Sequence, residues 1–497
     1  MKLNLVTFFA CLPTLFVEAS KFGSENVSLT SACRRACSRI ASDFNSATSN
    51  PGNGNLTVWD AKQQAVKSAC RVVPVSTDEV SRVMSIVVEE SCHFAVKGGG
   101  HARYPDDSVS VGGVTIDMQR MRSIHVSPNQ KTVKLGGGHT LHSVYEGLNP
   151  HNLTVAGGRA ATVGLGGYTL GGGISHLSPI YGLAMDNVFE YELILPNATV
   201  VVVTEDAHPD LYFALRGGMN NFGIVTHFII RAVFQGQIHA GDRTYTIDKR
   251  DAILDQAYRL TTQWKNNTAI SFSHGFGYHQ STGQYTVSFT PEYSHPILNP
   301  APFAELKRIP FETDTVRLGL ASEFSEDVSS ATPRGGRNLF ATATYYPSSE
   351  LDKQMQEIMM DEIKSVKWVP GFHPNMIMQP LYEAAIHAGN QRGGNTAGIE
   401  ADGPLTVVLS TVLWENSADD DAMNRFVSRW VESATSLIHK SGKDHPWLYI
   451  NYASKDQDPF SGYGETNLQR LRDIQKRVDP SGVFTSTGLC RGYFKLL

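Results

Sequence analysis

The chain has 497 residues, of which 41% are hydrophobic and 18% are charged, and its formal net charge is −5 at pH 7. This composition excludes a disordered or fibrous protein, and the length predicts two or three folded units rather than a single core. The slight acidity disfavours a nucleic-acid partner, because such a partner favours a basic face.

The first nineteen residues have the pattern of a secretory signal peptide. Lys2 provides the positive start, Leu3–Val17 is apolar, and small residues precede a cleavage point after Ala19. No other stretch is long enough to cross a bilayer, so no membrane partner is expected. We expect a secreted, N-glycosylated protein with Asn-x-Ser/Thr sequons at Asn26, Asn55, Asn152, Asn197 and Asn266.

Cysteine usage agrees with an oxidising compartment. After removal of the signal peptide the chain keeps Cys33, Cys37, Cys70, Cys92 and Cys490. The first four can form two disulfides, but three pairings are possible and the sequence does not choose among them. Buried free thiols are the alternative, and Cys490 is the odd cysteine.

The first half of the chain reads as short strands with a few helices. The best-defined helix is Thr77–Ser91, where Ser76 and Glu79 have capping-box spacing. Another helix is predicted at Cys33–Ser49, and the predicted strands are Phe94–Val96, Val109–Met118, Ser123–Val126, Thr132–Leu135, Glu190–Leu195, Thr199–Thr204 and Gly223–Phe234.

From about residue 240 long helices alternate with strands, which predicts an α+β unit. In the tail, Glu465–Val478 has the pattern of an amphipathic helix that ends at Asp479-Pro480. The other predicted helices are Arg250–Lys265, Glu350–Lys364 and Asp419–Lys440, and the strands are Gln284–Thr290, Leu339–Tyr345, Leu405–Leu413 and Trp447–Ala453.

Glycine runs are the densest signal in the sequence. Gly157–Gly173 holds eight glycines in seventeen residues, where average usage predicts about one. Successive backbone N–H groups in such turns form a concavity that binds anions, and a diphosphate held there needs no cluster of arginines. A single run can simply mark a tight turn. Three runs within 80 residues, the others being Gly98–Gly100 and Gly136–Gly138, favour a ligand.

Common nucleotide and hydrolase motifs are absent. The sequence has no G-x-G-x-x-G before a helix, no P-loop, no HExxH and no GxSxG, which disfavours a Rossmann dehydrogenase, a P-loop enzyme, a zinc protease and an α/β-hydrolase. His139 and His142 lie three residues apart, but no carboxylate pattern accompanies them. We interpret them as surface histidines and expect no metal site.

Several motifs in succession resemble the berberine bridge enzyme-like family, which has the vanillyl-alcohol-oxidase or PCMH-type FAD fold. The likeness is to fungal secreted oxidases of specialised metabolism, and it is strongest over residues 60–235 and 445–490. The motifs are Lys97–His101, Gly164–Tyr168, Gly171–Ser175, Tyr181–Asn187, Leu215–Thr226 and Tyr449–Tyr452 with Asp479-Pro480.

The resemblance implies a two-part PCMH-type FAD-binding domain with an inserted α+β substrate domain. After the signal peptide (1–19) and an N-terminal segment (20–65), the FAD-binding domain spans 66–237 and the substrate domain 238–444. Residues 445–497 form a C-terminal segment that completes the FAD domain.

The resemblance also implies FAD bonded covalently, through its 8α-methyl group, to His101. Relatives with a second link have a cysteine where Ala160 stands here, so a single attachment is expected. Tyr168 departs from the histidine of many relatives. The cofactor-binding residues implied are Gly98, Gly99 and Gly100 before His101, Thr162, Val163, Gly164, Gly166, Gly167 and Ser175 at the diphosphate, Ile224 and Val225 near the adenine, and Tyr449 and Asn451 beside the flavin.

For the catalytic base the resemblance favours Tyr452, because relatives use the matching tyrosine. A tyrosine is a poor base unless a neighbouring group stabilises its ionised form, and Asp402 is the partner considered. The alternatives are a packing role for Tyr452 and a turn role for Asp402 in Asp402-Gly403-Pro404.

The expected protein is an FAD-linked oxidoreductase. It would move a hydride from an alcohol or amine carbon of a small specialised metabolite to flavin, with O2 reduced to H2O2. A secreted carbohydrate oxidase, a flavin-dependent oxidative cyclase and a catalytically idle flavoprotein or binding protein are the alternatives. The sequence predicts neither the substrate nor the oligomeric state.

Overall fold

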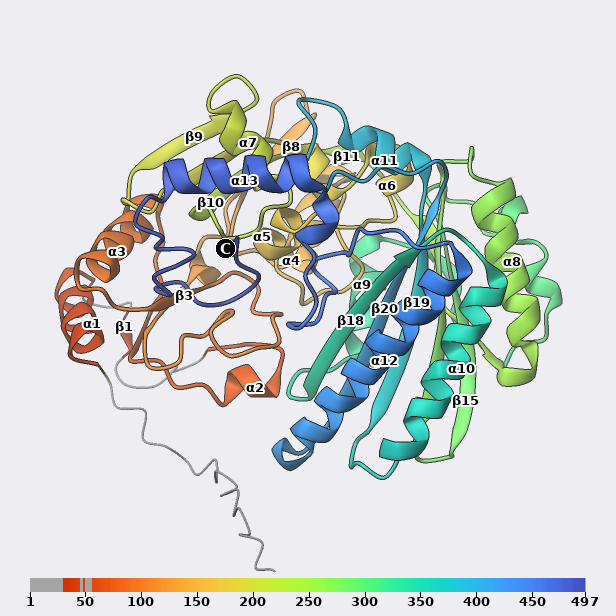
Figure 1. Ribbon diagram of the computed structural model, residues 1–497. Coiled ribbons are helices and arrows are strands. Elements are labelled where there is room, and N and C mark those ends of the chain that lie inside the picture. Colours follow the sequence, from red (N-terminus) through yellow and green to blue (C-terminus); the bar gives the residue numbers. More distant parts are fainter. Residues whose placement is uncertain (1–29, 45–47, 50–55, 497) are drawn as a thin grey trace, which may run out of the picture.

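The computed structural model describes residues 30–44, 48–49 and 56–496. The predicted signal peptide and the sequons at Asn26 and Asn55 lie outside the described residues. Two halves lie side by side (Figure 1). Helix α13 (Glu465–Val478) lies along the half formed mainly by the first 240 residues and contacts α7 (Pro209–Leu215), so the tail of the chain returns to its beginning.

The N-terminal half contains a small sheet of order β1-β2-β4-β3, in which β2, β4 and β3 are parallel. Apolar side chains of α1, α3, β2–β4 and the tail form one buried core with the sheet. The elements are α1 (Ser31–Asp43), β1 (Thr48–Ser49), α2 (Ala61–Gln64), β2 (Cys70–Val72), α3 (Thr77–Glu89), β3 (Phe94–Lys97) and β4 (Val114–Asp117).

A five-stranded antiparallel sheet of order β5-β6-β10-β8-β9 completes this half. Its core also includes Trp447, Tyr449 and Phe460 of the tail. The elements are β5 (Ile124–Val126), β6 (Thr132–Gly136), α4 (Leu141–Leu148), β7 (Leu153–Thr154), α5 (Leu165–Leu170), α6 (Ser178–Tyr181), β8 (Val188–Ile194), β9 (Val200–Thr204), α7, β10 (Ile224–Arg231) and β11 (Val233–Phe234).

The other half is a nine-stranded sheet with the path β16-β13-β15-β14-β19-β20-β18, and β12 and β17 pair beside it. Helices α8, α10 and α12 lie together along this sheet (Figure 1). The elements are β12 (Ile238–Ala240), β13 (Arg243–Thr246), α8 (Arg250–Gln263), β14 (Ile270–His279), β15 (Gln284–Tyr293), β16 (Thr313–Asp314), β17 (Arg317–Gly319), α9 (Ala321–Ala331), β18 (Arg337–Tyr345), α10 (Ser349–Val366), β19 (His373–Leu381), α11 (Glu383–Gly389), β20 (Leu405–Trp414) and α12 (Asp420–Ser441).

The two faces of this sheet have different partners. Phe272 and Phe276 of β14 and Met378 of β19 belong to the core that includes the side chains of α8, α10 and α12. Successive side chains of a strand point to opposite faces, so Ser273 and Gln379 point away from those helices. This second face contributes to the candidate active site.

The predicted mixture of helices and strands is confirmed, including the long helices of the second half. In α3 the Ser76 hydroxyl oxygen accepts from the Glu79 backbone N–H at 3.2 Å, as the capping box predicts. The predicted stripe of this helix is fully buried: Val80, Val83, Met84 and Val87. No observation tests the predicted domain boundaries, which stay predictions.

Three element predictions are wrong. Only Val114–Asp117 of Val109–Met118 is a strand, because the Asp106 carboxylate accepts from the Val111 N–H and Gly112 takes a positive φ of 69° in a turn. The first helix ends at Asp43 rather than Ser49. Trp447–Ala453 is no strand, since the N–H groups of Tyr452 and Ala453 both donate to the Tyr449 carbonyl and close a turn.

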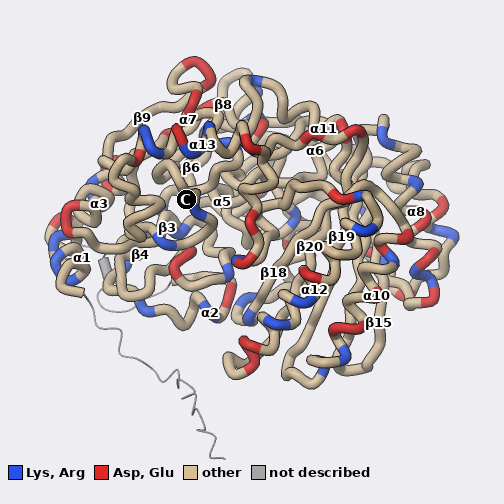
Figure 2. The backbone as a smooth tube through the Cα atoms, viewed as in Figure 1, with Lys and Arg blue, Asp and Glu red and all other residues tan. Residues whose placement is uncertain are grey.

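Acidic and basic residues are interspersed along the chain in both halves (Figure 2). None of the helices in the described ranges is long and apolar enough to span a membrane. Nor do the described residues include a group of three or more His, Cys, Asp or Glu able to hold a metal ion. His142 lies 3.4 Å from Glu146 and 3.2 Å from Glu326. The surface interpretation is wrong for His139, which is buried with Nδ1 2.8 Å from Ser143 Oγ.

The structure pairs the four N-terminal cysteines as Cys33–Cys92 and Cys37–Cys70. These bonds fasten α1 to the end of α3 and to β2 and close segments of 59 and 33 residues. Cys490 is a buried free thiol. The pairing therefore selects one of the three possibilities that the sequence leaves open.

We predict that the double variant Cys33→Ser/Cys92→Ser lowers the thermal midpoint by several degrees. Loss of a cross-link over a segment of this length removes about 2–4 kcal/mol of stability. Scanning calorimetry checks this, with Cys490→Ser as a control that leaves both pairs intact. An unchanged midpoint in the double variant would show that the 33–92 pair contributes nothing to stability.

Candidate active site

Three glycine runs meet at one place in the N-terminal half. A Cβ added to Gly99 would lie 2.4 Å from Gly164 Cα, and a Cβ on Gly98 would lie 3.3 Å from the Gly137 carbonyl oxygen. The same carbonyl lies 3.8 Å from a Cβ built on Gly166. A distance below 3.0 Å leaves no room for a side chain, so the Gly99 and Gly164 backbones cross only because both residues are glycines. The runs singled out in the sequence thus form one structure.

A buried ion cluster fixes the start of the first run. Lys97, the last residue of β3, donates to Asp117 Oδ1 at 3.0 Å, and Arg71 pairs with Asp117 Oδ2 at 2.7 Å. All three side chains are buried. Gly100 then takes a φ of +74°, so the chain turns sharply before His101.

His101 lies between an aromatic ring and a hydroxyl group. The Trp59 ring stacks on the imidazole with centroids 4.1 Å apart and an interplanar angle of 16°. Thr162 Oγ1 lies 3.1 Å from His101 Nδ1, within hydrogen-bonding distance. Burial, with the charges of Arg103 and Arg334, lowers the pKa of His101 to about 3. The imidazole is therefore neutral at ordinary pH and keeps a nucleophilic lone pair.

The glycine loops fit the charged bridge of FAD. Gly166 and Gly167 stand in the first turn of α5, where backbone N–H groups have no partner within the helix. A Cβ on Gly167 would meet nothing within 4 Å, so this backbone faces open space. Val225 adjoins the same place, because a Cβ on Gly137 would lie 2.9 Å from its carbonyl oxygen. Open, side-chain-free backbone of this kind can accept a diphosphate.

Two predicted flavin-side residues have clear packing roles. The Tyr449 hydroxyl oxygen accepts from the N–H groups of Gly173 at 3.1 Å and Ile174 at 3.2 Å, and from Asn451 Nδ2 at 3.1 Å. Burial raises the pKa of Tyr449. Tyr168, at the family's histidine position, donates to the Ile174 carbonyl at 2.9 Å and is also buried. These groups hold the Gly171–Gly173 turn.

Tyr452 of the tail contacts the second half of the molecule through its hydroxyl group. Its hydroxyl oxygen accepts from Arg159 Nη2 at 3.3 Å and from Gln379 Nε2 at 3.3 Å. Its ring packs edge-on against Tyr449 with centroids 4.6 Å apart. Two donors aimed at one oxygen stabilise negative charge that develops there.

The loop after His101 is fastened to the same turn. Arg103 donates to the backbone carbonyl of Ala453 at 3.0 Å and packs over the Phe340 ring at 4.2 Å. Residues 101–103 and 449–453 thus lie close together, although about 350 positions separate them in the sequence.

A narrow pocket opens beside Arg159 between the two halves. The first half contributes residues of the 159–179 segment, and the second contributes residues of β14, β15 and β19 and the start of α11. Its lining is Arg159, Ile174, Ser175, His176, Ser178, Pro179, Ser271, Phe272, Glu292, Gln379, Pro380, Leu381, Tyr382 and Ala385.

Some of the predicted site residues lie apart from the groups that they were expected to contact. Asp402 is exposed in the turn before β20, and the hydroxyl partners of Tyr452 are Arg159 and Gln379 instead. Ser175 lines the pocket between the halves with its backbone N–H bound to Ser178 Oγ. Thr162 contacts His101, while Val163 donates its backbone N–H to the Ala160 carbonyl. Ile224 and Val225 begin β10.

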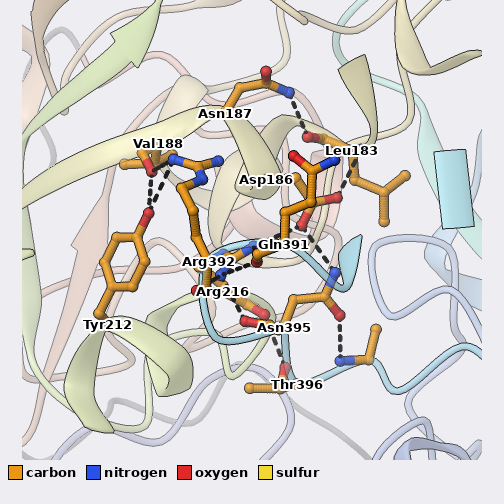
Figure 3. Close-up of polar contacts among 12 residues, drawn as sticks. Leu183, Asp186, Asn187, Val188, Tyr212, Arg216, Gln391, Arg392, Asn395 and Thr396 are labelled. Carbon is orange, nitrogen blue, oxygen red and sulfur yellow. Dashed lines mark hydrogen bonds and ion pairs between the residues drawn. The ribbon is translucent and has the colours of Figure 1, made fainter. Parts of the chain in front are cut away.

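A buried ion pair connects three further segments near the pocket (Figure 3). Arg216 lies 3.2 Å from Asp186 and donates to the carbonyls of Arg392 at 2.9 Å and Gly394 at 2.6 Å. Asn395 Nδ2 also donates to Asp186, at 2.9 Å. Residues of the Tyr181–Asn187 and Leu215–Thr226 motifs thus bind the loop that follows α11 and hold it in place.

Sequence reasoning missed Trp59, Arg103, Arg159, Glu292 and Gln379. Arg159 carried a usable signal, because it is the only charged residue in Gly157–Gly173. Gln379 carried none, since β19 begins His373-Pro374 and contains Pro380, and proline disfavours the strand assignment.

Comparisons with known proteins agree with this architecture. The FAD binding domain family matches residues 68–204, and the berberine and berberine like family matches residues 448–487. An FAD-dependent monooxygenase from Fusarium proliferatum is 33% identical over 86% of this chain and 85% of its own length.

Solved structures share the fold at low identity. A 6-hydroxy-D-nicotine oxidase from Arthrobacter nicotinovorans has a TM-score of 0.73 at 19% identity, covering 88% of this chain and 96% of that one. A glucooligosaccharide oxidase from Acremonium strictum, described with a 6-S-cysteinyl, 8α-N1-histidyl FAD, has a TM-score of 0.68 at 18% identity, covering 91% and 97%. The resemblance and the PCMH-type fold are confirmed, and the chain belongs to the berberine bridge enzyme-like family of FAD-linked oxidoreductases.

Proposed function

We propose that this FAD-dependent oxidoreductase is an oxidase of small specialised metabolites. It converts a carbon bearing a hydroxyl or amino group to the carbonyl or imine, and O2 takes the two electrons and two protons as H2O2. Bound FAD would accept the hydride that leaves the substrate carbon. The observation that carries the proposal is the Tyr452 hydroxyl, held at a pocket between the two halves.

In this proposal Tyr452 takes the hydroxyl or amine proton of the substrate. The donors from Arg159 and Gln379 hold its oxygen in position for this transfer. The Tyr449–Ala453 turn, fixed by Arg103, holds the ring in place. Asp402 has no part in this step.

We propose that FAD is attached once, through His101. A neutral imidazole between Trp59 and Thr162 is suited to bond to the flavin methyl group. Ala160, which adjoins Arg159, has no thiol for a second bond. The histidyl link described for the glucooligosaccharide oxidase supports the same chemistry here.

We predict that His101→Ala loses the flavin that remains with acid-precipitated protein. The variant lacks the nucleophilic nitrogen, so any FAD it binds is released by acid. Absorbance of the redissolved pellet near 450 nm measures this. His125→Ala, an exposed histidine on β5, is the matched control. Acid-stable yellow colour in His101→Ala would exclude His101 as the attachment site.

We predict that Tyr452→Phe lowers kcat by about 10²–10⁴-fold, the usual contribution of a general base. The flavin spectrum should persist, because the glycine loops do not depend on this hydroxyl. Anaerobic flavin bleaching by substrate measures the step, and Tyr258→Phe on the exposed face of α8 is the control. If the flavin of Tyr452→Phe bleached at the wild-type rate, Tyr452 would not be the base of the reaction.

Monooxygenation is a second candidate, because the Fusarium proliferatum relative has that name. The two reactions differ in where oxygen goes. An oxidase releases one H2O2 per product and incorporates no atom of O2, whereas a monooxygenase incorporates one. Turnover under 18O2, with measurement of the label in the product and of the H2O2 released per product, distinguishes the two reactions.

We also propose that the protein is secreted and N-glycosylated, which the two disulfides of the structure support. The three described sequon asparagines, Asn152, Asn197 and Asn266, are all exposed. We predict that treatment of protein secreted from a fungal host with an N-glycosidase lowers its mass. Asn→Gln at the three sites should reduce the shift, and a mass that enzyme treatment leaves unchanged would contradict glycosylation.

A further inference from the structure

Arg159, which is half-buried, differs from the three buried arginines in the partners of its guanidinium group. Arg71, Arg216 and Arg243 each pair with a carboxylate, at Asp117, Asp186 and Asp314. The contacts of Arg159 are neutral: Ser273 Oγ at 2.8 Å, Gln379 Oε1 at 2.8 Å and the Tyr452 hydroxyl at 3.3 Å. Among the described residues, no carboxylate forms an ion pair with it.

The position of Arg159 makes this missing partner significant. Burial opposes its charge, but the electrostatic influence of Tyr452 and Glu292 raises its pKa, so it remains a cation. A charge withdrawn from water is costly unless an opposite charge or further hydrogen bonds compensate it. The guanidinium has five N–H donors, and in the described part of the chain the three contacts leave some of them, including Nε–H, without a protein acceptor. Arg159 lines the pocket, where a bound anion can accept the hydrogen bonds for which the described residues provide no acceptor.

Glu292 limits the charge of a ligand that can bind in this pocket. It lines the same pocket from β15, opposite Ser271 in the strand pairing, and it forms no side-chain hydrogen bond or ion pair with another described residue. It is almost fully buried. Arg159 can bind one negative group, and the nearby Glu292 carboxylate disfavours a second one, so a dianion such as a phosphate monoester fits poorly.

The remaining lining can contact the rest of an organic acid through apolar and hydroxyl groups. Phe272, Leu381 and Ile174 provide apolar contacts, and Ser271 and Tyr382 offer hydroxyl groups. A carboxylate matches the planar donor arrangement of a guanidinium better than other monoanions of this size.

We propose that the substrate is a monocarboxylic acid whose carboxylate binds Arg159 and whose oxidisable hydroxyl or amino group faces Tyr452. The proposal rests on the proposed oxidase function, since it uses the same pocket. It makes Arg159 a residue that determines specificity. Glu292 then limits the ligand to one negative charge.

Binding without turnover tests the proposal separately from the reaction. Benzoate and benzamide have nearly the same shape and differ in charge at pH 7. We expect calorimetry with the flavin-loaded protein to give at least a tenfold tighter Kd for benzoate. Arg159→Gln should abolish the preference, and Arg159→Lys should retain part of it. Arg308→Gln, at an exposed position paired with Glu305, should leave it unchanged.

Glu292→Gln gives an independent test in the opposite direction. Removal of the negative charge should tighten benzoate binding several-fold and leave benzamide unaffected, even if Arg159→Gln protein fails to fold. Equal affinities of the wild type for benzoate and benzamide would overturn the proposal, as would a benzoate preference that survives in Arg159→Gln.

A substrate screen separates failure of this inference from failure of the oxidase function. Hydroxy acids and amino acids should release peroxide, while their methyl esters should show a KM at least tenfold higher. Peroxide from esters or neutral alcohols in preference to the acids would refute the carboxylate assignment and leave the oxidase function standing. Tight benzoate binding without peroxide from any screened compound would instead count against the oxidase function.

Discussion

The crossing of two backbones at Gly99 and Gly164 is the constraint on which the rest of the site depends. No side chain fits at either position, since a Cβ on one would lie within 2.4 Å of the other. The crossing brings the loop after β3 against the loop before α5, so that His101 meets Thr162 while Gly166 and Gly167 keep an open backbone. The buried Lys97–Asp117–Arg71 cluster holds one side of it. Backbone N–H groups and one imidazole, rather than a set of charged side chains, therefore form the candidate cofactor site.

The candidate reaction centre depends on contacts between segments that are distant in sequence. Arg103 ties the His101 loop to the Tyr449–Ala453 turn, and Arg159 joins the glycine loop to β14, β19 and Tyr452. The Asp186–Arg216 pair holds the loop after α11 against the first half (Figure 3). Each contact uses an arginine, whose several N–H donors can bind groups from more than one segment at once. Both halves must be in place before the Tyr452 hydroxyl has its two donors.

The sequence predicted what backbone chemistry and periodicity control. The stripe and cap of α3 follow from local rules and occur as expected. The glycine runs lie against one another in the structure, and the ligand predicted for them stays a prediction. The tail segment Trp447–Ala453 was assigned to a strand because its apolar and aromatic residues fit a strand pattern. The turn that forms instead depends on tertiary packing of Trp447 and Tyr449 in the core of the first half. Asp402 was considered because some relatives place a carboxylate on that part of the substrate domain, and a sequence motif does not reveal that its side chain is exposed.

The difference between local sequence rules and tertiary packing also explains why the family is easier to recognise than the substrate. Cofactor contacts made by backbone leave a glycine pattern in the sequence, because only glycine permits the close approaches and positive φ angles. Substrate contacts depend on which of two alternating faces a strand turns to the pocket and on which distant residue lies opposite. Ser273, Glu292 and Gln379 come from three strands, and only the pairing of those strands places them near Arg159. A cation without a carboxylate ion pair among the described residues can be identified only after that pairing is known, and this observation supports the proposed carboxylate ligand.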